Sequence, residues 1–232
     1  MAKKQYFLIV DTETTITDHV YDFGAIVVDR RGEIVKECAV IVADYQKETL
    51  FYDTSLPGLW SVAGLEKRTK AYAKMLENGS RMLASVNAIN RWLEKVNAQF
   101  SPELTAYNLA FDLSKCDNSG IDLSIFEKRF CLWQLAAGHY AGTKRYREFI
   151  LKNHLFNAPT TKGNMTFKTN AEVMASFVAG EMLPPEPHTA LEDAKHYELP
   201  ILRAICIRKQ WRERAKPYAW QDYQVRDWFA AK

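Results

Sequence analysis

The chain lacks the features that would mark it as a secreted, zinc-binding or membrane protein. Its four cysteines form no C-x-x-C pair, so a structural zinc site is not expected. The apolar run within the opening MAKKQYFLIV is too short for a secretory signal, and no segment approaches the roughly 20 apolar residues that span a membrane. We therefore expect reduced thiols, a cytoplasmic location and no contact with a membrane.

A strong excess of one charge is also missing. The formal net charge is +3 over 232 residues, which is too small to argue for nucleic-acid binding by itself. Residues 203–216 do concentrate basic side chains against one acid, Glu213. With Trp211, Tyr218 and Trp220 nearby, they have the content of a surface for single-stranded nucleic acid. The alternative, which we favour, is a solvated helix face whose aromatic rings pack on the core.

The apolar pattern predicts a mixed α/β fold. Five strands are expected, at residues 5–11, 23–29, 34–42, 103–108 and 127–132. The first three are joined by short links, so they are expected to form an antiparallel meander. A long helical stretch precedes the fourth strand and predicts a parallel crossover, so two parallel strands follow the three antiparallel ones.

Helices are predicted between and after these strands. The expected ranges are 64–77, 81–98, most of 133–180 with a loop at 158–167, and a last helix after His188. Pro200 lies inside the pattern of the last helix. Because proline cannot continue a regular helix, we expect a kink or break near residues 196–200.

Two acids end the first predicted strand, in the stretch FLIVDTETT. Asp11 and Glu13 are two residues apart, so on a strand both side chains point the same way. Two carboxylates at the end of a buried strand repel each other and lose hydration. A hard divalent cation with oxygen ligands relieves both costs. The alternative is a strand that ends in two solvated acids.

A second set of polar residues follows the fourth predicted strand, in AYNLAFD. Asn108 and Asp112 are four residues apart, on one face if the segment is helical. Taken alone, the segment favours a simpler interpretation. In that interpretation Asn108 caps a helix, and Asp112 is an exposed acid in its first turn.

A third set, EPHTALEDA, opens the last predicted helix. Thr189 and Glu192 have the T-x-x-E spacing of a capping box, which predicts a helix start at this point. His188 then lies on the loop just outside the helix, and Asp193 lies in its first turns. That arrangement suits a proton-transfer residue beside a fixed metal ligand. Taken alone, the segment favours the simpler interpretation, a helix start with an incidental surface histidine and aspartate.

Taken together, these three motifs resemble those of the DnaQ-like 3′–5′ exonucleases, in the subgroup with four acids and a histidine (DEDDh). DxE ends the first strand, NxxFD follows the fourth, and HxAxxD opens the last helix. The resemblance implies an RNase H-like fold with a five-stranded mixed sheet flanked by helices. It assigns residues 1–205 to the exonuclease domain and leaves 206–232 as a basic and aromatic C-terminal extension packed on the same domain.

The resemblance also implies a metal site and a reaction. In such a site Asp11, Glu13, Asp112 and Asp193 hold two Mg²⁺ or Mn²⁺ ions, with Asp11 between them. His188 takes the proton from the attacking water. The implied substrate is the 3′ end of a single strand, with DNA favoured and RNA as the alternative, and the products are nucleoside 5′-monophosphates.

Five further residues are candidate contacts to the substrate. Thr14 and Thr15 follow the second acid, where the family places the terminal nucleotide. Asn108 and Phe111 belong to the second motif, although a structural asparagine and a core phenylalanine are the simpler interpretations. Leu65 stands where many relatives carry a hydrophobic-Gly-Ile-Thr signature, which the stretch LWSVAGLEKR matches poorly.

Two other classes of protein share part of this pattern. Aspartate-nucleophile phosphatases also place acids after a buried strand, but they need DxD and give no role to HxAxxD. A catalytically silent nucleic-acid-binding module would have lost one or more of the metal acids, whereas this chain keeps all of them. Residues 113–170 carry no family signature, and the sequence indicates no particular protein partner.

Overall fold

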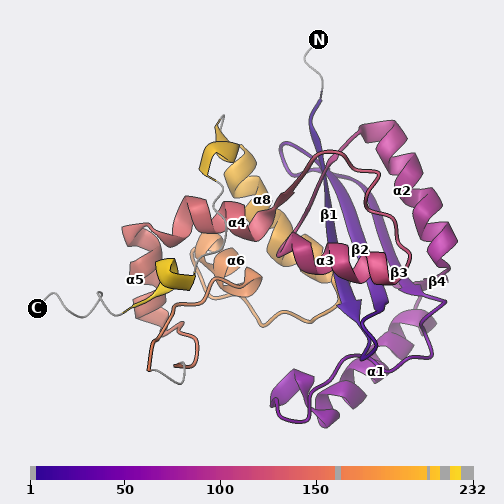
Figure 1. The fold of residues 1–232 in the computed structure, drawn as a ribbon, viewed down its shortest axis with the longest axis horizontal. Helices are drawn as coiled ribbons and strands as arrows, with labels where there is room; N and C mark the ends of the chain where they lie inside the picture. The colour runs from indigo at the N-terminus through magenta and orange to yellow at the C-terminus, as the bar shows by residue number, and fades with distance from the viewer. Residues whose placement is uncertain (1–3, 160–162, 208–209, 215–219, 226–232) are drawn as a thin grey trace, which may run out of the picture.

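The computed structural model describes residues 4–159, 163–207, 210–214 and 220–225. They form one mixed β-sheet with helices on both faces (Figure 1). The strands are β1 (Tyr6–Thr14), β2 (Val20–Asp29), β3 (Ile34–Val42), β4 (Met82–Ala84), β5 (Glu103–Ala106) and β6 (Arg129–Cys131).

Eight α-helices and several single turns are found in the described ranges. The helices are α1 (Val62–Glu77), α2 (Val86–Phe100), α3 (Leu109–Asn118), α4 (Leu132–Ala136), α5 (Lys144–Asn153), α6 (Ala171–Ala179), α7 (Ala190–Asp193) and α8 (Leu199–Cys206). Two turns are π-helical, at Ala137–Ala141 and Ala194–Glu198. Three are 3₁₀-helical, at Gly58–Trp60, Trp211–Arg214 and Trp220–Tyr223.

The sheet has the strand order β4-β3-β2-β1-β5-β6. β1, β2 and β3 form the antiparallel meander that the sequence predicts, and β5 and β6 continue the sheet parallel to β1. β1 is central because its residues Phe7 to Val10 are all completely buried, which requires cover on both faces. The C-terminal ends of β1 and β5 therefore lie side by side at one edge of the sheet.

The sheet has six strands, so the prediction of five is wrong. The additional strand, β4, lies within the residues 81–98 that were expected to be helical, and it pairs in parallel with β3. Met82, which recurs at helical spacing with Val86, Ile89, Leu93 and Val96 in the sequence, is 67 % exposed and belongs to no core face. Helix α2 begins only after Ser85, whose hydroxyl accepts the N–H of Ala88 as an N-cap.

Two hydrophobic cores lie on opposite faces of the sheet. On one face, α2 and α3 pack with Leu8 and Val10 of β1. On the other face, α4, α5, α6 and α8 pack with Phe7 and Ile9. Side chains alternate along a strand, so the next odd-numbered residue, Asp11, continues the second face.

The last predicted helix is divided into three parts. α7 is followed by the π-helical turn Ala194–Glu198 and then by α8, in whose first turn Pro200 lies. Proline has no N–H to donate to the preceding turn. Residues 190–206 stay helical without interruption, so the predicted break is absent, and the irregularity is a π-helical turn just before Pro200.

The described part of the C-terminal extension packs on the core. Trp211 is buried, and its ring centroid is 5.7 Å from that of Phe7 and 4.9 Å from that of Phe130. Arg212 stacks on Trp211 and pairs with Glu103. These contacts show that the Trp211 ring is docked on the core, while the division at residue 205 stays a prediction. Four members of the basic and aromatic segment lie outside the described residues: Arg208, Lys209, Lys216 and Tyr218.

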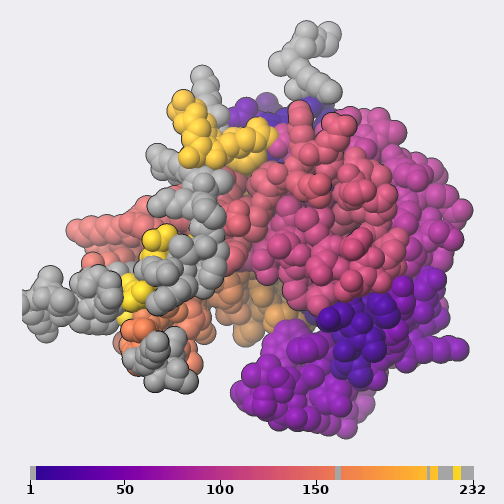
Figure 2. Space-filling model, viewed as in Figure 1, coloured from indigo at the N-terminus to yellow at the C-terminus, as the bar shows by residue number. Residues whose placement is uncertain are grey.

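Figure 2 presents the outer surface in the same view. The purple residues of α1 form a lobe at the lower edge, near the C-terminal end of β1. Among the helices of the described ranges, none is long and apolar enough to cross a membrane.

Candidate functional site

The candidate site lies at the C-terminal end of β1. Asp11 and Glu13 leave the strand on the same face as Ile9, and their backbones pair with Gly24 and Asp22 of β2. Both α7 and the π-helical turn after it contact β1 at this end. The alternation of the strand therefore directs both carboxylates toward the segment that carries the HxAxxD motif.

Asp112 is linked to β1 through Thr12, whose side chain lies on the opposite face of the strand from Asp11 and Glu13. The hydroxyl of Thr12 donates a 2.9 Å hydrogen bond to Oδ1 of Asp112. Asp112 is 3 % exposed in the first turn of α3, which begins after Asn108 in the left-handed conformation (φ 74°). Burial raises the pKa of Asp112 to about 8, although the Thr12 hydrogen bond lowers it. Asp112 is thus a buried acid, not the exposed first-turn acid of the simpler interpretation.

Two residues of β2 hold the start of α7 against the sheet. A Cβ added to Gly24 would come within 2.3 Å of the Ala190 carbonyl carbon, so a larger residue would push α7 away. Asp22 is completely buried and accepts the N–H of Ala190 at 3.0 Å. His188 precedes this contact in the left-handed conformation (φ 53°). β2 thereby fixes the position of the whole HxAxxD motif relative to β1.

The capping box predicted for Thr189 and Glu192 is replaced by other contacts. The Thr189 side chain makes no capping hydrogen bond, and its N–H donates to Oδ2 of Asp193 at 3.0 Å. Glu192 pairs with Arg81 instead, with Oε2 of Glu192 2.5 Å from Nη2 of Arg81. A charged guanidinium is a stronger partner for a carboxylate than a backbone N–H, which explains the exchange.

Glu13, His188 and Asp193 converge at the end of β1. One ligand atom of each lies within 4.8 Å of the other two, and Nδ1 of His188 is 3.7 Å from Oε1 of Glu13. Two buried carboxylate oxygens, Oδ2 of Asp11 and Oδ1 of Asp193, have no hydrogen-bond partner among the described residues. Unpartnered buried oxygens of this kind are costly, and a divalent cation with oxygen ligands removes the cost.

The acids of this cluster repel one another. Burial raises the pKa of Asp11 well above its ordinary value, and four neighbouring carboxylates raise it further. These four are Glu198, Asp112, Glu13 and Asp193. Burial, followed by the charge of Glu13, raises the pKa of Asp193 to about 8. A bound cation favours the ionised form of all these acids, so the donor set fits Mg²⁺ or Mn²⁺.

His188 lies beside this cluster with its side chain 29 % exposed. Its ring packs edge-on against Trp60, with the centroids 4.7 Å apart. Burial lowers the pKa of His188, but the nearby Glu13 carboxylate and the charges of the other acids outweigh burial and raise it above the ordinary value. Without a cation, the neighbouring carboxylates therefore favour the protonated, positively charged form of His188.

A cleft of about 390 Å³ opens over these residues. Its polar floor is formed by Asp11, Thr12, Glu13, Thr14, Asp112 and His188. Its rim carries Asp18, Phe51, Trp60, Tyr107, Phe111 and Lys115. Lys115 pairs with Asp18 (Nζ to Oδ1, 2.6 Å) and lies over the ring of Phe111. The cleft therefore combines an acidic floor with an aromatic rim.

Two of the five predicted substrate contacts line this cleft. Thr14 is 8 % exposed at its floor, and Phe111 is 43 % exposed at its rim. The exposure of Phe111 argues against the interpretation of this ring as a core side chain.

The other three predicted contacts lie elsewhere. Thr15 is completely buried, and its hydroxyl donates to Glu48 at 2.8 Å. Leu65 packs on a small apolar cluster that includes Tyr72. Asn108, the N-cap residue of α3, lines a neighbouring hollow.

Sequence patterns did not reveal three other residues of the site: Trp60, Arg81 and Glu198. Arg81 is 1 % exposed and binds Asp22 through two hydrogen bonds, Nε to Oδ1 at 2.8 Å and Nη2 to Oδ2 at 3.2 Å. Its partner is 59 residues away, so no local pattern marks the pair. Trp60 lies in an irregular segment without periodicity, and Glu198 is in a π-helical turn.

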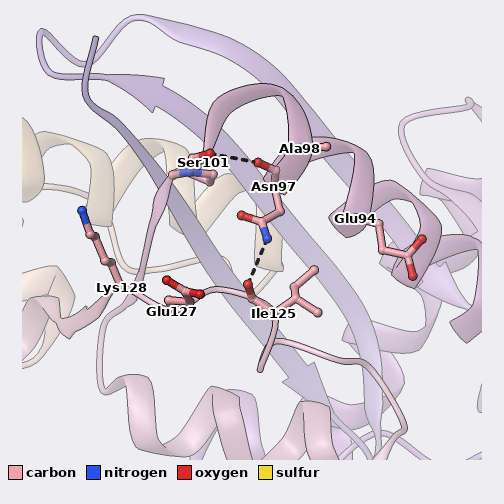
Figure 3. Close-up of a pocket in the computed structure, with 8 residues that line it drawn as sticks. Glu94, Asn97, Ala98, Ser101, Ile125, Glu127 and Lys128 are labelled. Atoms are coloured by element: carbon pink, nitrogen blue, oxygen red, sulfur yellow. Dashed lines mark hydrogen bonds between the residues drawn. The ribbon is translucent and has the colours of Figure 1, made fainter. Parts of the chain in front are cut away.

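A larger hollow, of about 530 Å³, lies far from these acids (Figure 3). It is lined by residues at the C-terminal end of α2 and by the segment before β6, and the Asn97 amide donates to the Ile125 carbonyl at 2.9 Å. Pro102 and Lys128 place it at the N-terminal ends of β5 and β6, the opposite edge of the sheet from the acids.

Comparison with known proteins does not show a family for this chain. No protein-family model matches the chain, and no curated protein matches it. It is similar to a solved structure of E. coli Exonuclease I in complex with a 5cy-dT13 oligonucleotide, with a TM-score of 0.48 and 14 % sequence identity. The match covers 88 % of this chain and 41 % of that one, so the chain spans less than half the length of that protein.

Without divalent cations, we expect the protein to lose stability as the pH rises from about 5 to about 9. Burial raises the pKa of Asp112 and Asp193 to about 8 in the folded state, whereas unfolded aspartates titrate near 4. Between these values the folded state holds protons that the unfolded state has released, so the stability present below pH 4 is lost through pH 8. We expect a loss of a few kcal/mol, which is on the order of 10 °C in melting temperature.

Scanning calorimetry between pH 5 and 9, in EDTA and in Mn²⁺, measures this loss. Mn²⁺ should remove most of it, because a bound cation stabilises the ionised acids. Asp112→Asn should flatten the pH dependence in EDTA. Identical pH slopes with and without Mn²⁺ would argue against a cation site in this cluster.

Proposed function

We propose that this protein is a divalent-metal-dependent 3′–5′ exonuclease of the DnaQ-like DEDDh type, built on an RNase H-like fold. The observation that carries the proposal is the convergence of Glu13, His188 and Asp193 within 4.8 Å, beside unpartnered buried oxygens of Asp11 and Asp193. The residues come from opposite ends of the predicted domain, and a locally acidic strand end does not explain their convergence.

Four carboxylates are the proposed cation ligands. Asp11, Glu13 and Asp193 offer oxygens from β1 and α7, and Asp112 offers them from α3 on the other face of β1. Two divalent cations held by these carboxylates would supply charge that polarises a phosphodiester and stabilises its hydrolysis. The rigid elements and the Thr12 and Thr189 hydrogen bonds hold the carboxylates in place before any ligand arrives.

His188 is the proposed acceptor of the proton of the attacking water. It lies on the loop before α7 next to the cleft, and Glu13 and Trp60 restrain its ring. An imidazole with a pKa near its ordinary value of about 6.5 is a good base near neutral pH. Cation charge in the cluster offsets the carboxylates that raise the pKa of His188, and so brings it back toward that range.

The lining of the cleft supports a single-stranded 3′ end as the substrate. A volume of about 390 Å³ suits one nucleotide, and Phe51, Trp60 and Phe111 offer rings on which a base can stack. Stacking accepts any base, as an enzyme that removes successive nucleotides requires. DNA is the first candidate and RNA the alternative, and the assay below separates them.

A panel of 3′-labelled strands tests the proposed function. Single-stranded DNA, duplex DNA and RNA are incubated with the protein in Mg²⁺, Mn²⁺ or EDTA, and the released label is identified. We expect a labelled nucleoside 5′-monophosphate from the single strand in either metal and no release in EDTA. Retention of the strand without release of label would instead favour a nucleic-acid-binding module.

Replacing His188 by alanine should lower the rate of release by about 10²–10⁴-fold, the usual contribution of a general base. Mn²⁺ binding should be largely retained, because four carboxylates remain. The rate of wild type and His188→Ala is measured from pH 5.5 to 9, together with Mn²⁺ affinity. An unchanged rate and an unchanged pH profile would remove the proton-accepting role from His188.

A further inference from the structure

Glu198 is a buried acid that the proposed mechanism does not use. It closes the π-helical turn Ala194–Glu198 and is 2 % exposed. One oxygen, Oε1, accepts the N–H of Tyr107 at 3.0 Å. The other, Oε2, is buried and has no hydrogen-bond partner within the part of the chain that the structure describes. A half-satisfied buried carboxylate requires a reason, because its desolvation is costly.

The π-helical turn explains how Glu198 reaches the site. In a regular α-helix, five residues correspond to about 500° of rotation, so Glu198 would point about 140° away from Asp193. A π-helical turn bonds each N–H to the carbonyl five residues before it, and here Leu199 N–H donates to Ala194. The wider turn brings residues five apart to nearly the same face. Glu198 therefore lies on the side of the segment that carries Asp193.

The contact with Tyr107 places Glu198 beside the acids of β1 and α3. Tyr107 follows β5, whose Thr105 pairs with Ile9 two residues before Asp11, and it lines the same cleft as Asp11 and Asp112. After burial, Glu198 is the neighbour that raises the pKa of Asp11 most, ahead of Asp112 and Glu13. Asp112 is in turn the carboxylate that most raises the pKa of Glu198. The unpartnered Oδ2 of Asp11 is buried in the same region. Glu198 is thus close to the Asp11–Asp112 side of the cluster.

We propose that Glu198 is a fifth carboxylate of the metal centre, and that its free oxygen contributes to binding the divalent cation on the Asp11–Asp112 side. Its other oxygen holds the turn at Tyr107, from which α3 and Asp112 begin. This inference rests on the proposed function for the identity of the site, but it concerns cation binding and is testable without nucleic acid.

Mn²⁺ is titrated into the full chain, and its binding is measured by calorimetry and by the paramagnetic resonance of free Mn²⁺. Variants of Glu198 then separate the contribution of its charge from that of its shape. Glu198→Gln preserves the shape and still accepts the Tyr107 N–H, but it removes the charge. We expect it to weaken binding of one Mn²⁺ by about tenfold or more. It should also raise the melting temperature in EDTA, because one source of repulsion is removed. Glu103→Gln, a buried acid at the other end of β5, is the control and should bind Mn²⁺ as wild type does.

Each other outcome has a defined meaning. Unchanged Mn²⁺ affinity in Glu198→Gln overturns the proposal. A defect in Glu198→Ala alone also overturns it, because Glu198 would then only anchor the turn at Tyr107. If Glu198→Gln binds Mn²⁺ weakly and wild type digests no strand, the inference stands and the proposed function fails. If wild type binds no Mn²⁺, both fail.

Discussion

Replacing Asp11 by asparagine is expected to abolish metal-dependent release of nucleotides, with a loss of at least about 10³-fold. One carboxylate oxygen of Asp11, Oδ2, is buried and has no hydrogen-bond partner among the described residues. Burial, and then the charges of the other acids of the cluster, raise the pKa of Asp11. A neutral amide cannot supply a second anionic oxygen to the cations that orient and polarise the phosphodiester. The measurement is the initial rate of label release from a 3′-labelled single strand in Mn²⁺.

The same variant should remain folded. Removing one of several repelling buried charges should leave the melting temperature in EDTA equal to that of wild type or above it. Asp122→Asn is a matched control, because Asp122 is an exposed acid in a turn that asparagine also favours. If Asp11→Asn keeps near-normal turnover, Asp11 is not a ligand of the catalytic cations.

Replacing Arg81 by alanine is expected to cost about 3–5 kcal/mol in the free energy of unfolding, the usual result of breaking a buried ion pair. Arg81 and Asp22 are both buried, and their two hydrogen bonds leave no route for water. Without the guanidinium, Asp22 is a buried charge supported only by Tyr72 and the N–H of Ala190. Because Ala190 begins α7, the loss also loosens the support of His188.

Urea denaturation of Arg81→Ala, Glu192→Gln and the Arg81→Ala/Asp22→Asn pair measures this effect. Glu192→Gln should cost far less, on the order of 1 kcal/mol, because Glu192 is partly exposed and solvent screens its interaction with Arg81. The double variant should recover part of the stability, since it removes the uncompensated charge. Equal costs for Arg81→Ala and Glu192→Gln would mean that the buried pair is not what holds α7.

Much of the fold was predictable because local patterns determine it. The fully apolar run before Asp11 required a central strand, and Pro200 indicated an irregularity in the last helix, where a π-helical turn is found. Strand ends and helix starts carry the motif residues, and a parallel arrangement of β1 and β5 brings such ends to one edge. Glu13, His188 and Asp193 therefore come within ligand distance of one another although no local pattern links them.

The failures share a different physical cause. β4 is only three residues long, and its exposed Met82 fell into register with the stripe of the following helix. Glu192 pairs with Arg81 and not with Thr189, and Arg81 is 111 residues away from Glu192 in the sequence. Glu198 enters the site only because a π-helical turn shifts its direction. Contacts between distant segments and a local change of helical period leave no trace in a single sequence.

The central claim, that the acid cluster cleaves phosphodiesters from a free 3′ end, is tested most directly with one strand in two forms. A linear single-stranded DNA and its circularised form are incubated with the protein in Mn²⁺, and the products are resolved by size. The account predicts that the linear strand is converted to nucleoside 5′-monophosphates, while the circle stays intact and EDTA stops the reaction. Cleavage of the circle, or survival of the linear strand in both Mn²⁺ and Mg²⁺, would contradict it.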